Sequence, residues 1–220
     1  CTAARSLGRI PVIFYDCSTA PNPRRARMFI AEKGLEIESR EISIAERQQL
    51  SADFLVINPH GTIPVLTTDD GATLTENLAI ARYLELLHPD PPLMGSSARE
   101  EAEVLMWNAI VEAQGGHPIA EALRNSHPAF ENRAIPGPDN HAQVPELAER
   151  GFRRVARFFD LLDARLSDSP YLAGNFFSLA DISAFVFVDF ARVIKMRIPA
   201  EHSATQRWFD TISQRPSAAL

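Results

Sequence analysis

The segment His88-Pro89-Asp90-Pro91-Pro92 constrains the fold of this chain more than any other feature of its sequence. Proline removes a backbone donor and clashes with the preceding helical turn, so a stretch this rich in proline is stiff and non-helical. Strand-like and helical patterns alternate before this segment, whereas no convincing strand follows from Ala98 onward. The sequence therefore predicts a domain over residues 1–88, a linker over 89–95 and a second domain over 96–220.

The first half alternates β and α patterns. A β-branched, aromatic run over residues 10–15 is followed by a polar loop over 17–23, and a helical pattern over 24–33 ends at Gly34. An extended segment over 37–44 precedes a predicted helix over 46–57. Strands over 63–66 and 72–74 flank an Asp-Gly turn, and apolar residues then recur at helical spacing over 78–87. The predicted order is β-α-β-α-β-β-α.

The second half reads as helical throughout. Helices are predicted from residue 98 past 107, over 145–166, over 179–194 and over 205–214. Gly115, Gly116 and Pro118 interrupt the first of these, so a kink or break is expected there. The second domain is therefore predicted to be all-α.

Charge and residue usage exclude several classes of function. The formal charge of −6 repels phosphate backbones and anionic lipid surfaces, so neither nucleic-acid binding nor membrane binding is expected. The apolar runs are too short to cross a bilayer, and a signal-peptide pattern is missing, so a cytoplasmic protein is expected. Two cysteines build neither a disulfide scaffold nor a cysteine-ligated zinc site, and the six histidines lack paired ligand spacing. No metal is expected.

The loop over residues 17–23 precedes the first helix and carries the first candidate site. The first backbone N–H groups of a helix have no intrahelical partner and attract anions. Arg24, Arg25 and Arg27 follow this loop. An anion site and a solvated arginine-rich helix face are both compatible with this pattern.

A set of ordered motifs then resembles the glutathione transferase family. The motifs are Asn58-Pro59-His60-Gly61-Thr62-Ile63-Pro64-Val65-Leu66, Glu76-Asn77-Leu78-Ala79-Ile80, Tyr171-Leu172-Ala173-Gly174 and Phe177-Ser178-Leu179-Ala180-Asp181-Ile182. The resemblance covers nearly the whole chain. Within the family, Tyr15-Asp16 and the run Ala31-Glu32-Lys33 are most similar to the atypical fungal second-transferase type and its bacterial relatives.

The resemblance implies a fold, a cosubstrate and partners. The fold would be an α/β thioredoxin-like N-terminal domain followed by an all-α C-terminal domain. The protein would be a glutathione transferase, an enzyme that activates the thiolate of its cosubstrate glutathione for attack on an electrophilic substrate. The second partner, a small electrophile or hydroperoxide, would bind against the helical domain. The protein would be a homodimer.

The resemblance also implies a set of glutathione-binding residues. These are Gln49, Thr62, Ile63, Pro64, Glu76 and Asn77. The backbone of Ile63, before a cis Pro64, would pair with the cysteinyl part of glutathione. Glu76 would face the γ-glutamyl ammonium and Asn77 its carboxylate, while Gln49 would reach the glycyl carboxylate. The alternatives are that Glu76 only complements the helix dipole and that Gln49 is an ordinary surface residue.

The chain differs from the better-known glutathione transferase classes at the position of the residue that stabilises the thiolate. Those classes carry Ser or Cys at the position of Ala20, and alanine donates no side-chain hydrogen bond. The neighbouring Ser18, Thr19 and Asn22 are the candidates for this catalytic role. The resemblance to the atypical subgroup implies instead a water held by polar residues of the helical domain. The polar candidates on the first long helix are Asn108, Glu112, Gln114 and His117. For His117, a solvated helix end is the alternative.

Two rival functions stay open on the same fold. Ala20 favours a non-catalytic protein that binds glutathione or apolar ligands. Cys17 favours a glutathione-dependent reductase or peroxidase, because a cysteine after the first strand can form a mixed disulfide. The register argues against that chemistry, since Cys17 lies three residues before the position at which the related classes carry their cysteine.

Ser178 and Asp181 form a capping box, with Phe177 positioned to pack on Ile182. This motif indicates a folding device and not a binding site. Because it removes the helix cap, Asp181→Ala is expected to lower the free energy of unfolding by about 1–2 kcal/mol.

Overall fold

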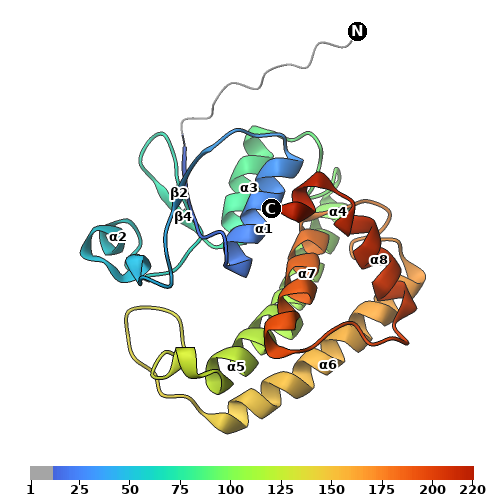
Figure 1. Ribbon diagram of the computed structural model, residues 1–220. Coiled ribbons are helices and arrows are strands. Elements are labelled where there is room, and N and C mark those ends of the chain that lie inside the picture. The colour runs from blue at the N-terminus through green and yellow to red at the C-terminus, as the bar shows by residue number, and fades with distance from the viewer. Residues whose placement is uncertain (1–11) are drawn as a thin grey trace. The chain divides into compact units, whose positions relative to one another are not determined.

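A computed structural model describes residues 12–220 of the chain (Figure 1). Residues 10 and 11 of the predicted first strand lie outside the described residues. The chain divides into two compact units, one comprising Cys1–Pro91 with Leu220 and the other Pro92–Ala219.

A four-stranded mixed sheet forms the centre of the first unit. Its strands are β1 (Ile13–Asp16), β2 (Glu38–Glu41), β3 (Val65–Thr67) and β4 (Thr73–Thr75), in the spatial order β2-β1-β3-β4. β1 pairs parallel with β2 and antiparallel with β3, and β3 pairs antiparallel with β4. The parallel pair requires a crossover, which α1 (Pro21–Glu32) supplies.

Alternation along β1 sends side chains to both faces of this sheet. Tyr15 packs with Val65 and with Phe54 of α2 (Ala52–Ile57), and the Tyr15 and Phe54 rings meet edge to face at 5.9 Å. α1 and α3 (Asn77–Leu87) lie side by side (Figure 1), and each buries an apolar stripe that includes Phe29 and Leu84. Both faces of the sheet therefore carry core residues.

The first two helices of the first unit begin at other residues than predicted. α1 begins at Pro21 and not at residue 24, because the fixed φ of proline suits the first helical position. The helix predicted over 46–57 is instead a 3₁₀ turn over Gln48–Leu50 followed by α2. Ser51 separates them: its backbone is extended, and its hydroxyl accepts the Phe54 N–H at 3.2 Å and caps α2.

The second unit consists of helices. They are α4 (Ala98–Val111), α5 (His117–Ser126), α6 (Pro145–Asp168), α7 (Leu179–Phe190) and α8 (Ser203–Ser213). Every residue of α7 from Leu179 to Val188 is buried, so this helix is the core element of the unit. The predicted fold class, an α/β unit of order β-α-β-α-β-β-α followed by an all-α unit, is confirmed.

The predicted interruption at the glycines between α4 and α5 is a change of helix type and not a break. Residues Glu112–Gly116 form a π-helical turn that joins the two helices without a loop. A Cβ atom on Gly115 would lie 2.6 Å from the Phe158 ring, and one on Gly116 would lie 2.5 Å from the Phe187 ring. The glycines are therefore required because two core aromatic rings press on the helix backbone.

Candidate functional site

Three segments meet at one end of the sheet in the first unit. Val65, the first residue of β3, is paired with Tyr15 near the end of β1 and with Thr75 at the end of β4. Because both pairings are antiparallel, the loop after β1, the segment before β3 and the first turn of α3 all leave the sheet at this edge. The helices α1 and α3 therefore begin at the same end, where their dipoles favour negative charge.

The start of α1 offers one backbone donor among its first three residues. Pro21 and Pro23 have no N–H, so the amide of Asn22 is the donor that remains. Ala20 occupies the N-cap position without a side-chain cap. The Asn22 side chain is exposed, and its Oδ1 accepts a hydrogen bond from Arg25 Nη1 at 3.4 Å.

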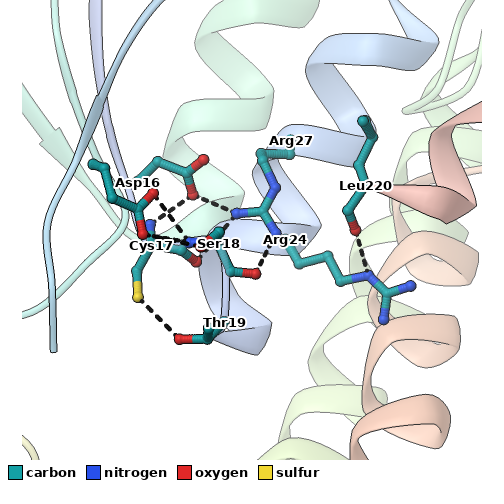
Figure 2. A network of polar contacts seen from close by, with 8 residues as sticks. Asp16, Cys17, Ser18, Thr19, Arg24, Arg27 and Leu220 are labelled. Atoms are coloured by element: carbon teal, nitrogen blue, oxygen red, sulfur yellow. Dashed lines mark hydrogen bonds and ion pairs between the residues drawn. The ribbon is translucent and has the colours of Figure 1, made fainter. Parts of the chain in front are cut away.

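The two hydroxyl groups of the loop face different partners (Figure 2). Ser18 Oγ donates to Glu41 on β2 at 3.1 Å, and the Ser18 N–H donates to the same carboxylate at 2.9 Å. Thr19 Oγ1 lies 3.4 Å from Cys17 Sγ. The Cys17 thiol is buried, whereas Ser18 and Thr19 are exposed. Of the two hydroxyl groups, only that of Ser18 is held by a carboxylate.

The side chain of Asn58 fixes the segment before β3 through hydrogen bonds to Thr62. Its buried amide donates to the Thr62 carbonyl at 2.8 Å and contacts Thr62 Oγ1 at 3.1 Å. The Ile63–Pro64 peptide bond is cis, as the family resemblance implies. Within residues 12–220, no hydrogen bond engages the backbone N–H or C=O of Ile63. Both groups are therefore free to pair with an extended ligand.

The start of α3 combines backbone strain with an unpaired polar group. Glu76 precedes the helix with φ 65° and ψ 132°, a conformation that is rare for a residue with a side chain. Its side chain is exposed. Asn77 is buried, and its Oδ1 has no partner among the described residues. Gln49, in the 3₁₀ turn before α2, likewise has a buried Oε1 without a partner in the described part of the chain.

The water-holding candidates belong to the second unit. His117 begins α5 and is exposed. Asn108 is buried in α4, where its Oδ1 accepts the hydroxyl of Ser183 at 2.7 Å. The structure thus brings the glutathione-binding candidates of the first unit to one sheet edge, while His117 belongs to the second unit.

Sequence reasoning missed one pair of residues at this edge. Asp16, the last residue of β1, is buried and paired with Arg27 of α1 at 2.5 Å. Burial raises the pKa of Asp16, although the charge and hydrogen bond of Arg27 and the Cys17 N–H oppose the rise. The available signal in the sequence is an acid at a strand end with an arginine on the following helix. The same arginine also fits the predicted anion site, so the pattern does not single out the pair.

Metal ligation and membrane crossing depend on what the side chains and helices of residues 12–220 offer. Across these residues, no three His, Cys, Asp or Glu side chains cluster as metal ligands would. Over the same residues, none of the helices combines the length and apolar character that crossing a membrane requires.

Comparison with known proteins identifies both units. Residues 19–87 match the glutathione S-transferase N-terminal domain, and residues 121–216 match the C-terminal domain. Glutathione S-transferase 2 of Saccharomyces cerevisiae is 30% identical over 211 residues, which cover 94% of this chain and 87% of the yeast protein.

Solved structures agree with the sequence matches. The crystal structure of Gtt2 from Saccharomyces cerevisiae superposes with a TM-score of 0.86 at 29% identity, covering 94% of this chain and 98% of that one. A Gtt2-class glutathione S-transferase of Vibrio parahaemolyticus gives 0.79 at 31% identity, covering 93% and 94%. The chain belongs to the glutathione S-transferase family.

Proposed function

We propose that this protein is a glutathione transferase that binds glutathione at the described sheet edge and activates its thiol for attack on a small electrophile. The observation that carries the proposal is the free backbone of Ile63 beside the strained start of α3, where Asn77 presents an unpaired buried oxygen. We further propose a cytoplasmic homodimer, with residues 1–88 binding glutathione, 89–95 as linker and 96–220 providing the electrophile site.

The residues at this edge fit the parts of glutathione. The N–H and C=O of Ile63 suit the cysteinyl amide groups in a strand-like pairing. The Glu76 carboxylate suits the γ-glutamyl ammonium, and the amide of Asn77 offers both a donor and an acceptor to the same end of the ligand. The side-chain amide of Gln49 suits the glycyl carboxylate. Thr62 and Pro64 shape the segment that presents Ile63.

The chemical task is to stabilise a thiolate. A free thiol with a pKa near ~8.5 is mostly protonated at neutral pH, and lowering that pKa by about 2 units takes roughly 2.7 kcal/mol. The N-terminus of α1, with the single amide of Asn22, favours negative charge in front of the loop. A hydroxyl donor would add a charge-assisted hydrogen bond. We assign that donor to Thr19 ahead of Ser18, whose hydroxyl already donates to Glu41.

Glu76→Gln is expected to weaken glutathione binding about tenfold, because an ion-assisted hydrogen bond contributes about 1.5–3 kcal/mol and the amide keeps only part of it. Titration calorimetry with reduced glutathione measures the dissociation constant. Glu149→Gln, which alters an exposed glutamate on α6, is the matched control and should bind as the wild type does. An unchanged dissociation constant for Glu76→Gln would remove this residue from the site.

Thr19→Val is expected to raise the pKa of the bound glutathione thiol by about 1 unit, because one charge-assisted hydrogen bond to the thiolate is lost. Thr19→Ser should restore the wild-type value. Ser18→Ala should leave the pKa of the bound thiol unchanged, because the Ser18 hydroxyl donates to Glu41. Asn22→Ala should also leave it unchanged, because this variant keeps the backbone N–H of residue 22. Thiolate absorbance followed against pH measures all four variants. A rise with Ser18→Ala and none with Thr19→Val would reverse the assignment.

A second candidate function follows from Ala20. Because this N-cap residue contributes no side-chain donor, the protein could hold glutathione without activating it. Bound glutathione with an unshifted thiol pKa would favour this binding role. The disulfide chemistry of a reductase or peroxidase depends instead on Cys17, whose thiol is buried behind Thr19. Loss of activity in Cys17→Ser would favour that chemistry.

A further inference from the structure

A polar network lies behind the loop that follows β1 (Figure 2). Arg27 Nη1 donates to Asp16 Oδ1 at 2.5 Å and to the Cys17 carbonyl at 3.1 Å, and Arg27 Nη2 donates to the Ser18 carbonyl at 3.2 Å. One guanidinium therefore binds a buried carboxylate and two successive carbonyl groups. A lysine ammonium lacks the planar fork that makes such contacts at once.

The N–H groups of the same loop are fixed as well. The Cys17 N–H donates to Asp16 Oδ1 at 2.7 Å, and the Ser18 N–H donates to Glu41 at 2.9 Å. All four backbone polar groups of Cys17 and Ser18 are thus held by three charged side chains. Arg24, one turn before Arg27 on the same helix, contacts the Leu220 carbonyl instead at 2.9 Å.

Open space borders the Asp16–Arg27 pair on one side. Asp16 and Arg27 line an open cavity of about 590 Å³ together with Phe14, Ile30 and Ile37. Ser18 and Thr19 are exposed, so hydrogen bonds and not packing hold this part of the loop. A group that positions a charged ligand loses its effect when it moves by about 1 Å. The position of Thr19 and of the α1 N-terminus therefore depends on the Asp16–Arg27 pair.

We infer that Asp16 and Arg27 are positioning residues. They hold the loop at residues 17–20 in the place from which Thr19 and the N-terminus of α1 stabilise the thiolate of bound glutathione. The inference rests on the proposed function, because it assigns to this loop the thiolate-stabilising role proposed above. In this role neither side chain would contact the ligand. Both act through the backbone of Cys17 and Ser18.

The test compares Arg27→Met and Asp16→Asn with the wild type, and Arg99→Met serves as the control because it breaks an exposed ion pair on α4. Each purified protein is titrated with reduced glutathione, and thiolate absorbance is followed against pH. Arg27→Met should raise the pKa of the bound thiol by about 1 unit, a tenfold loss of thiolate below that pKa, while the glutathione dissociation constant changes less than about threefold. Arg99→Met should match the wild type.

A role in stability alone predicts a different result. A folded Arg27→Met variant whose bound thiol keeps the wild-type pKa would overturn the inference. If Arg27→Met does not fold, Asp16→Asn decides, because asparagine keeps an oxygen for the Cys17 N–H and removes the charge that holds Arg27. It should raise the pKa in the same direction by a smaller amount. A wild-type protein with an unshifted thiol pKa would refute the proposed function itself, which distinguishes the two failures.

Discussion

Asp181→Ala is expected to lower the free energy of unfolding by about 4 kcal/mol, because it leaves several buried donors without an acceptor. Asp181 is fully buried at the start of α7. It accepts hydrogen bonds from the Leu172 N–H at 3.0 Å, from the Ser178 N–H at 3.1 Å, from Ser178 Oγ at 2.9 Å and from Trp208 Nε1 at 3.0 Å. The capping box alone accounts for about 1–2 kcal/mol. Urea denaturation at pH 7.5 measures the difference.

Asp210→Ala is the matched control for this change, because Asp210 is an exposed aspartate of α8. It is expected to stay within about 0.5 kcal/mol of the wild type, as surface substitutions do. In a Trp208→Phe background, Asp181→Ala should lower the free energy of unfolding by about 1 kcal/mol less than in the wild type. The indole N–H, one of the donors that the change leaves without an acceptor, is already absent there. A cost near 1 kcal/mol in the wild-type background would show that the contacts beyond the helix cap contribute little.

The same carboxyl group predicts a dependence of stability on pH. Burial raises the pKa of Asp181 to about 6, although Leu172, Trp208 and Ser178 donate to it. In the unfolded chain aspartate titrates near ~3.9, so between these values the folded protein binds more protons. The stability that Asp181 contributes therefore falls as pH rises from about 4 to about 6 and is constant above. From pH 4 to pH 6, the free energy of unfolding of the wild type, minus that of Asp181→Asn, should fall by up to about 3 kcal/mol. A difference that widens with pH would contradict the assigned direction.

Lys33→Met is expected to lower the free energy of unfolding by about 3–5 kcal/mol, because it removes one partner of a buried ion pair, Lys33–Glu85. The Lys33 side chain is fully buried at the end of α1. It pairs with Glu85 of α3, donates to the Pro91 carbonyl at 2.5 Å and to the Pro89 carbonyl at 3.3 Å, and lies 5.6 Å from the Phe29 ring centroid. Lys33 therefore joins two helices to the proline-rich segment. Chemical denaturation at neutral pH measures the loss.

Lys195→Met is the natural comparison, because Lys195 is exposed in the helical unit. It should change stability by less than about 0.5 kcal/mol. The double variant Lys33→Met/Glu85→Leu should recover part of the loss, since a buried ion pair replaced as a whole by apolar side chains is far less costly than a single unpaired charge. Equal stability of Lys33→Met and Lys195→Met would show that the buried pair contributes nothing.

The fold was predictable where local chemistry and tertiary packing agree. The Asp-Gly turn between β3 and β4 and the apolar periodicity of α3 are examples. The predictions were wrong where one residue type serves two purposes. Ser51 reads as a helix interior residue but caps α2, and Gly115 reads as a helix breaker but admits the Phe158 ring. Such positions depend on contacts with residues distant in the sequence.

The site was predictable only in part, for the same reason. The motif around Ile63 and the pair Glu76-Asn77 are adjacent in sequence to the elements that present them. The partnership of Asp16 with Arg27 depends on the path of the intervening loop, which no local pattern specifies. The positive φ of Glu76 was also unpredictable, because residues other than glycine, asparagine and aspartate rarely adopt it.

The most direct test of the account is the pKa of the glutathione thiol bound to the wild-type protein, measured from thiolate absorbance against pH. A sheet edge that joins the free backbone of Ile63 to two helix N-termini predicts a bound thiol with a pKa about 2 units below its free value. The same titration without protein provides the reference. Bound glutathione with an unshifted pKa would contradict thiol activation, and failure to bind glutathione at all would contradict the site.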